Sequence, residues 1–366
     1  MAKLNSQNRL IKLAIAASLM STAFSTPLNV SGAVRRDDAA GVQTIPAKEL
    51  KLDAKAFGAS IEGASVNKAG DVYAVDFRGK GATSTSSFGF FHQTSGGLDH
   101  VLGQDPIIIA KGTQDTFLAG SRFVKGGEKV LLADAQNKRV MVVEVASKKA
   151  SVFCENVKML QPNDIAISTK RDCLIYLSGQ KYVENTAAGV DGDLWTCDGN
   201  KATQFSPAIL KKAGIHRTNG IEVDPKGEFL YLSSAANVKS VVSNLKIFKF
   251  VLDKETGALL EKDPVVFHDF SHEKDADLDG MRTDVDGNLY VSLNGAGKIA
   301  KIDPNGKLLQ YITTPGVKGP STLELGGKEG KTLFAAGRCD NKDKAPGCAV
   351  SIDVDKPGRA FTSLNA

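Results

Sequence analysis

The chain has 366 residues, of which 42% are hydrophobic and 24% are charged, as is typical of a globular protein. No run of about 18 apolar residues occurs, which excludes a transmembrane helix. Residues 1–36 contain five of the 46 Lys and Arg residues and none of the 41 Asp and Glu residues, so the net charge of +5 comes from this segment alone. The rest of the chain is neutral and has no basic stripe, which excludes nucleic-acid binding.

The N-terminus has the layout of a secretory signal. Lys3, Arg9 and Lys12 precede an apolar run at 13–24, and small residues follow it. The pair Arg35-Arg36 is a candidate processing site. We therefore expect residues 1–36 to be a signal peptide with a short pro-segment, and residues 37–366 to form a single secreted domain that does not contact a membrane.

From residue 60 onward one sequence pattern recurs. It consists of a polar or small residue, a short apolar strand, a Gly-containing turn and a second strand centred on an aromatic residue or Leu. The six copies begin at Glu62, Gly120 (or Ser121), Asn163, Asn219, Asp279 and Ser321. The central residues of the six second strands are Tyr73, Leu132, Tyr176, Tyr231, Tyr290 and Phe334, at spacings of 59, 44, 55, 59 and 44.

Alternating apolar positions separated by turn residues indicate β-hairpins, and a hairpin repeated every 40–60 residues is typical of a propeller. Further strands follow each copy, so we predict an all-β fold, a six-bladed β-propeller with four antiparallel strands per blade. A seven-bladed propeller, with its extra blade in an insertion at 80–118, is the main alternative. The segment at 42–52 can supply the outer strand of the last blade and close the ring.

The first residues of the copies are expected to surround one mouth of the central channel. Four of them carry oxygen ligands suited to a hard cation, two as carboxylates and two as amides: Glu62, Asn163, Asn219 and Asp279. Asn-Gly and Asp-Gly are also common turn dipeptides. A preference for turn residues would not, however, place a glutamate at the equivalent position of another copy, as at Glu62. Glycine follows three of the four, where we expect it to allow a sharp turn and to leave room for a substrate above the metal.

The five cysteines allow two disulfides. Cys339 and Cys348 flank a polar loop and are predicted to pair in an oxidising compartment. Cys154, Cys173 and Cys197 leave one further pair and one free thiol, and the sequence does not decide between the pairings. No Cys/His pattern typical of a zinc site is present.

Over roughly residues 50–355 the chain resembles the senescence marker protein (regucalcin), gluconolactonase and luciferin-regenerating-enzyme-like family. The resemblance rests on Glu62-Gly63, on the sequence PND at 162–164, on NG with its strand at 219–223, and on DGM followed by GNLYV within 279–291. It implies a six-bladed propeller that binds one divalent cation, with calcium as the first expectation and Zn²⁺, Mn²⁺ or Mg²⁺ as alternatives. It also implies that the four residues selected by the repeat are the ligands and that the substrate is a small lactone or ester.

Two residues differ from the family's pattern at positions that bear on the identity of the substrate. Ala64 replaces the proline of the family's EGP, and Gln161 stands where related sugar-lactone hydrolases often have an arginine. Gln161 and His216 are our candidates for substrate binding, and Asp279 is our candidate catalytic base or nucleophile. No Gly-x-Ser-x-Gly motif of a serine hydrolase is present. The alternatives are a non-catalytic metal-binding propeller, a phosphotriesterase-like enzyme or a strictosidine-synthase-like enzyme on the same fold.

Overall fold

The computed structural model describes six stretches of the chain and one further residue: 41–50, 52, 58–77, 87–91, 107–108, 117–340 and 347–366. The predicted signal segment and most of the 80–118 insertion lie outside these residues. Within the described part, no helix is long and apolar enough to cross a membrane.

The 25 described strands form six sheets, five with four strands and one with five. The first three sheets, in chain order, consist of β3 (Ile61–Val66), β4 (Val72–Asp76), β5 (Ser87–Phe91) and β6 (Ile107–Ile108); β7 (Leu118–Phe123), β8 (Lys129–Asp134), β9 (Arg139–Glu144) and β10 (Lys149–Glu155); and β11 (Gln161–Ile167), β12 (Leu174–Gln180), β13 (Gly192–Asp198) and β14 (Lys201–Gln204).

The remaining sheets contain the other strands. They consist of β15 (Arg217–Val223), β16 (Phe229–Val238), β17 (Val241–Val251) and β18 (Val265–Asp269); β19 (Asp277–Thr283), β20 (Leu289–Asn294), β21 (Lys298–Ile302), β22 (Leu308–Thr313) and β1 (Gln43–Pro46); and β23 (Gly319–Gly326), β24 (Thr332–Arg338), β25 (Cys348–Asp353) and β2 (Lys48–Leu50).

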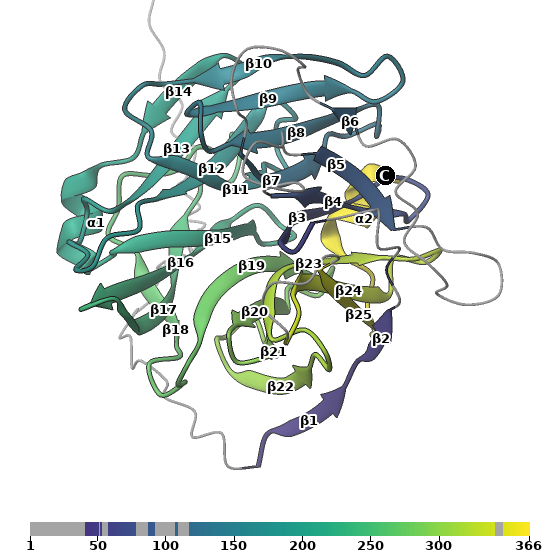
Figure 1. The fold of residues 1–366 in the computed structure, drawn as a ribbon. Helices are drawn as coiled ribbons and strands as arrows, with labels where there is room; N and C mark the ends of the chain where they lie inside the picture. Colours follow the sequence, from purple (N-terminus) through teal and green to yellow (C-terminus); the bar gives the residue numbers. More distant parts are fainter. Residues whose placement is uncertain are drawn as a thin grey trace, which may run out of the picture. The chain divides into compact units, whose positions relative to one another are not determined.

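The first strands of the six sheets surround a common centre (Figure 1). We call them the inner strands: β3, β7, β11, β15, β19 and β23. Each inner strand contacts the next along the chain, and β23 contacts β3, so the series closes on itself. The chain is therefore an all-β propeller.

The sequence repeat corresponds to the hairpin formed by the first two strands of each sheet. The six predicted central residues all lie in second strands, from Tyr73 in β4 to Phe334 in β24. Five of them are buried, three with 0% exposure, and Tyr73 is half-buried. They pack between neighbouring sheets, which explains why large apolar residues recur at this position.

The N-terminal strands complete the last two sheets. β2 pairs antiparallel with β25 as the outer strand of the last sheet, as the sequence predicted. β1 pairs with β22 in parallel and adds a fifth strand to the preceding sheet, which the repeat did not predict. In the first sheet, β5 and β6 from the 80–118 insertion are the outer strands, and the described residues contain no seventh sheet.

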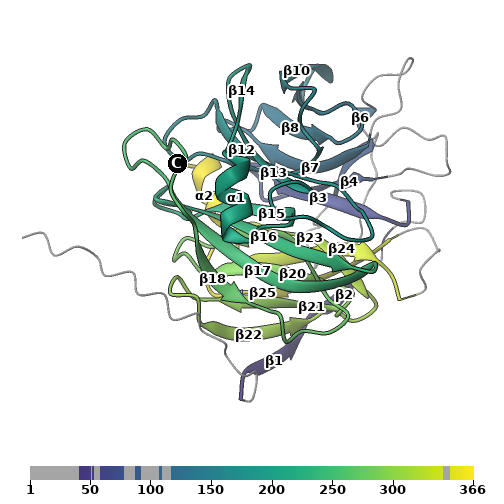
Figure 2. The same cartoon turned by 90° about the vertical axis from the view of Figure 1, so that its left-hand side faces the viewer.

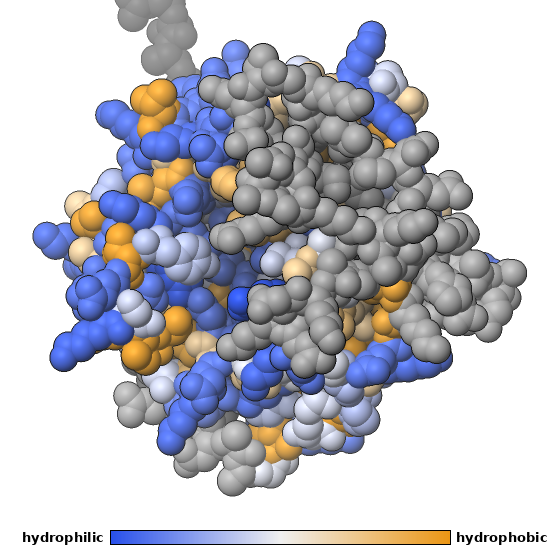
Figure 3. Space-filling model, in the orientation of Figure 1, coloured by the Kyte–Doolittle hydropathy of each residue, from blue (hydrophilic) through white to orange (hydrophobic). Residues whose placement is uncertain are grey.

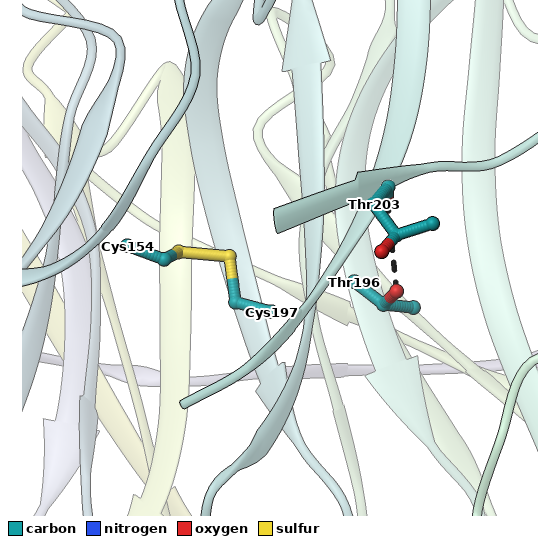
Figure 4. The surroundings of a disulfide bond; sticks show 4 residues. All are labelled: Cys154, Thr196, Cys197 and Thr203. Carbon is teal, nitrogen blue, oxygen red and sulfur yellow. Dashed lines mark hydrogen bonds between the residues drawn. A yellow bond between two sulfur atoms is a disulfide. The ribbon is translucent and has the colours of Figure 1, made fainter. Parts of the chain in front are cut away.

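Two disulfides are present. Cys339–Cys348 joins the ends of β24 and β25 as predicted. The second joins Cys154 on β10 to Cys197 on β13, and so links the second sheet to the third (Figure 4). Cys173 is the free, exposed cysteine. Two disulfides are typical of proteins that fold in an oxidising compartment.

Two short helices complete the described structure. α1 (Pro207–Ala213) begins with the side chain of Ser206 accepting from the backbone N–H of Ile209 and ends at Gly214, whose φ is 73°. α2 (Arg359–Leu364) contacts β19 and β23. In Figure 2 it lies on the left, whereas β24 ends on the right, so α2 and the end of β24 are at opposite faces of the propeller.

Candidate functional site

A β-bulge interrupts all six inner strands at the same phase. The pairing of each inner strand with its second strand shifts between Glu62 and Ser65, Leu118 and Ser121, Pro162 and Ile165, Thr218 and Ile221, Leu278 and Met281, and Pro320 and Thr322. A bulge leaves an extra residue out of the ladder and redirects its side chain. In five inner strands the site residue lies within the bulge, and in β3 Glu62 is the last paired residue before it, so each bulge places one side chain at the centre.

Side chains from all six inner strands line one small cavity where the bulges lie: Glu62, Ala119, Asn163, Asn219, Asp279 and Ser321, with Asp164 and Thr322 beside them. The structure thus brings together all four residues predicted as ligands. The start assigned to the second copy, Gly120 or Ser121, was wrong. Leu118 pairs with Asp134 as Ile61 pairs with Asp76, so the equivalent of Glu62 is Ala119, which offers no side-chain ligand.

The glycines that follow the site residues have a packing role. A Cβ on Gly220 would lie 2.0 Å from the carbonyl oxygen of Asp279, and one on Gly63 would lie 2.1 Å from that of Ala119. Neighbouring inner strands therefore approach so closely that only glycine fits. Of the three, only Gly63 also has a positive φ, of 51°. The predicted room for a substrate is filled instead by the backbone of the next strand.

Replacing Gly220 by Ala should lower the free energy of unfolding by about 2–3 kcal/mol, because the new methyl group overlaps a backbone oxygen that cannot move alone. Gly280→Ala is the matched control, since its Cβ would meet nothing closer than 3.0 Å, and about 1 kcal/mol is expected. Urea unfolding of both variants measures the difference. Equal stability of the two variants would contradict this account of the glycines.

Burial disfavours the ionised forms of Glu62 and Asp279. Burial and then the charge of Asp279 raise the pKa of Glu62 well above its ordinary value. Burial also raises the pKa of Asp279 to about 7, although Asn294 Nδ2 donates to its Oδ2 at 2.8 Å. A divalent cation between the two groups would reverse this effect, because opposite charge favours the ionised forms.

The donor set fits a hard cation. Asn163 Nδ2 donates to Asn219 Oδ1, so the two amides are in direct contact. Rotating a side-chain amide by 180° exchanges the positions of its nitrogen and oxygen. After such a rotation the amide oxygens of Asn163 and Asn219 can both face a shared ion. Two carboxylates and two amide oxygens match the preference of calcium for oxygen ligands. No cluster of three or more His, Cys, Asp or Glu that could hold a metal occurs among the described residues, so the amides are essential to the proposed set.

A larger cavity of about 600 Å³ opens above these four residues. Its walls include the aromatic residues Phe77, Phe117 and Tyr182, and the cations Lys181 and Arg338. Gln161, a predicted substrate-binding residue, also lines it. His216 does not: its Nδ1 lies 3.0 Å from the carbonyl oxygen of Thr186 and 3.2 Å from Thr186 Oγ1.

Four wall residues that the sequence did not predict come from the ends of second strands. Phe77 follows β4, Lys181 and Tyr182 follow β12, and Arg338 ends β24. In an antiparallel hairpin the end of the second strand lies beside the start of the first. The repeat phase that selected the four candidate oxygen ligands could therefore also have selected these positions.

Tyr182 is held in the wall by buried polar groups. The guanidinium carbon of Arg217 lies 4.7 Å from the centre of the Tyr182 ring, in a cation–π contact. Arg217 is fully buried and forms an ion pair with Asp277 at 2.7 Å, while its Nη1 donates to Gln180 at 3.2 Å. Tyr182 itself is 59% exposed, and the buried Arg217 supports its ring in the cavity wall.

A buried ion network lies beneath the candidate metal site. Its members come from five inner strands and from α2: Arg122, Asp164, Glu222, Arg282, Glu324 and Arg359. Arg122 pairs with Asp164 at 3.1 Å, and Arg282 pairs with Glu324 at 2.8 Å and with Asp164 at 3.6 Å. Because β11 and β19 are not neighbours in the ring, the Arg282–Asp164 pair crosses the channel. Arg359 of α2 joins the network by pairing with Glu222.

Comparison with known proteins identifies the family. Residues 62–336 match the SMP-30/Gluconolactonase/LRE-like region. The chain belongs to this family. The match to the SMP-30/gluconolactonase/LRE-like family begins at Glu62 and ends in β24, so it covers all six inner hairpins and confirms the resemblance seen in the sequence.

Curated relatives of this SMP-30/gluconolactonase/LRE-like chain are distant. It is 28% identical over 233 residues to a gluconolactonase of Zymomonas mobilis, which covers 59% of this chain and 60% of that protein. It is 34% identical over 110 residues to an uncharacterised protein of Sulfolobus acidocaldarius, which covers 30% and 38%. The chain thus spans three-fifths or less of the curated relatives it matches.

Solved structures of the SMP-30/gluconolactonase/LRE-like fold align over most of the chain. A calcium-binding regucalcin from Agrobacterium tumefaciens has a TM-score of 0.63 at 17% identity, covering 86% of this chain and 97% of that one. A gluconolactonase from Xanthomonas campestris has a TM-score of 0.55 at 15% identity, covering 81% and 87%. At these identities the likeness establishes the fold.

Proposed function

We propose that this protein is a six-bladed propeller that binds one divalent cation, calcium in the first instance, and hydrolyses a lactone or a related ester. One observation carries the proposal: four oxygen-bearing side chains from four different inner strands converge at the floor of a cavity of about 600 Å³. The distant homology to a gluconolactonase supports the reaction class.

The described surface on the face drawn in Figure 3 is largely hydrophilic, with apolar residues in small, scattered patches. This surface supports recognition of a small molecule in the cavity rather than docking of a protein through a broad apolar face. The aromatic and amide walls can bind a ring of modest size, with Gln161 in contact with the substrate. Because His216 bonds to Thr186 instead of lining the cavity, we assign it no role in binding.

When bound, the cation would polarise the carbonyl group of the substrate. The chain would hold it through Glu62, Asn163, Asn219 and Asp279. Asp279 is our candidate base, and its orientation is fixed because Asn294 donates to Oδ2. It would accept a proton from a water molecule whose oxygen bonds to the carbonyl carbon. The ring C–O bond then breaks, the proton passes to the departing oxygen, and the product is a hydroxycarboxylate.

The test uses exported protein, which should begin between residues 26 and 37 if residues 1–36 direct export. Elemental analysis should find about one divalent cation per chain. A chelator should abolish hydrolysis of a panel of aliphatic and aromatic lactones and lower the melting temperature, because the ion binds only the folded state and joins four inner strands. Added calcium should restore both the hydrolysis and the melting temperature.

Two results would contradict the proposal. Full activity in metal-free protein would eliminate the metal mechanism. Retained metal with no turnover of any lactone or ester would indicate a metal-binding propeller without catalysis.

A further inference from the structure

Arg338 stands out among the cavity walls because its backbone is fixed on both sides. It is the last residue of β24, and the next residue, Cys339, is bonded to Cys348 of the neighbouring strand β25. The preceding residue, Gly337, pairs with Cys348 in the ladder. An exposed strand end that would otherwise fray is thereby held at the cavity mouth.

The charge of Arg338 is available to a ligand. Its side chain is exposed and lines the cavity, and its guanidinium interacts electrostatically with the Glu62 carboxylate. It forms no ion pair with any residue in the described part of the chain. Elsewhere in this protein, buried arginines are matched by carboxylates, as Arg217 is by Asp277.

The charge balance of the cavity follows from this arrangement. Glu62 and Asp279 carry two negative charges, which one divalent cation neutralises. Arg338 and Lys181 then leave the loaded cavity positive, and a guanidinium presents paired donors that match a carboxylate. Arg338 comes from the sheet next to Glu62, whereas Lys181 comes from the third sheet, on the opposite side of the ring. Lys181 belongs to the same sheet as the candidate ligand Asn163, so position alone does not separate the two cations. Arg338 differs in presenting paired donors from a backbone that the Cys339–Cys348 disulfide holds, and it is therefore the better match to a carboxylate beside the reacting carbonyl.

We propose that Arg338 determines substrate specificity by binding a carboxylate on the substrate, so that the preferred substrates are lactones or esters that carry a negative charge. This inference rests on the proposed hydrolase function and names its substrate class. Tyr182, supported by Arg217, provides an aromatic wall of the same cavity.

The test compares two lactones that share one ring. γ-Valerolactone carries a methyl group where γ-carboxy-γ-butyrolactone carries a carboxylate. At saturating calcium and low salt, the wild type should hydrolyse the carboxylated lactone with a kcat/KM at least about tenfold higher. Arg338→Gln should lower kcat/KM for that lactone by about 10- to 100-fold and change the value for γ-valerolactone by no more than about twofold. Arg338→Lys should retain part of the preference, because it keeps the charge without the paired donors.

Lys331→Gln is the matched control. It removes one positive charge at the other end of the same strand, where Lys331 is 45% exposed and pairs with Glu329 at 3.3 Å. It should leave the ratio of the two kcat/KM values unchanged. A wild-type preference for γ-valerolactone, or the same ratio in Arg338→Gln as in the wild type, would overturn the inference while leaving the hydrolase function standing.

Calorimetry separates the inference from the hydrolase function. The calcium-loaded protein is titrated with the two ring-opened products, 2-hydroxyglutarate and 4-hydroxypentanoate. Wild type should bind 2-hydroxyglutarate at least about tenfold more tightly, and Arg338→Gln should lose this difference. If no lactone or ester is hydrolysed but this difference is found, the hydrolase proposal fails and anion recognition stands. If the two products bind equally, anion recognition fails.

Discussion

Asp279→Asn should lower kcat for a hydrolysed lactone by about a hundredfold or more even at saturating calcium, because loss of a general base typically costs a factor of this size. Glu62→Gln is the matched comparison. Each substitution removes one of the two neutralising carboxylates from the same cavity, so both variants should require more calcium. Once calcium is saturating, only Asp279→Asn should remain impaired.

The measurement is turnover as a function of calcium concentration for the two variants and the wild type. Calcium affinity, measured in parallel by calorimetry, shows whether each variant has reached saturation. Full recovery of Asp279→Asn to the level of Glu62→Gln would contradict a chemical role for Asp279 and leave it as a ligand.

Arg282→Met should lower the free energy of unfolding by about 3–5 kcal/mol, because it leaves Glu324 buried without its closest partner and removes one of the two arginines that pair with Asp164. The Arg282 side chain is 2% exposed and that of Glu324 is 0% exposed. Arg282→Met combined with Glu324→Gln should recover part of the loss, since the double variant no longer buries the uncompensated Glu324 charge.

The control for this prediction is the exposed pair of Lys212 and Asp263, whose side chains are 71% and 56% exposed. Lys212→Met should change the free energy of unfolding by no more than about 0.5 kcal/mol. Urea unfolding of the three variants checks both statements. If Arg282→Met were as mild as Lys212→Met, the ion network beneath the candidate metal site would not be a source of stability.

The sequence was sufficient to predict the repeating hairpin and the convergence of four oxygen-bearing side chains, because both follow from a periodic pattern along the chain. A large apolar residue such as Tyr290 must recur wherever two sheets pack together, and Asn163, Asn219 and Asp279 share one phase of that repeat. The pairing of β2 with β25 also followed, because a ring of hairpins needs a strand at its seam.

The features that escaped prediction depend on non-local geometry. The site position of β7 is Ala119, which lacks the polar side chain that marks the start of the other copies, so only the pairing of Leu118 with Asp134 reveals it. The pairing of Cys154 with Cys197 depends on which sheets are neighbours. The repeat phase could have indicated the position of Arg338 at the end of a second strand, but residue types at this position vary from sheet to sheet, so the sequence gives no reason to single out the arginine.

The position of β2 also constrains the order of events during synthesis. Residues 48–50 leave the ribosome nearly 300 residues before β25 at 348–353, so the last sheet cannot be completed on a partial chain. Until then the ring stays open. After β25 emerges, and before β2 pairs with it, the backbone groups on the outer edge of β25 are unpaired and can bond to another chain. Closure therefore joins contacts of very large sequence separation, which makes it a slow, late step. A nascent chain delayed at this point would be most exposed to mispairing with its neighbours, and a chaperone that shields strand edges would act there.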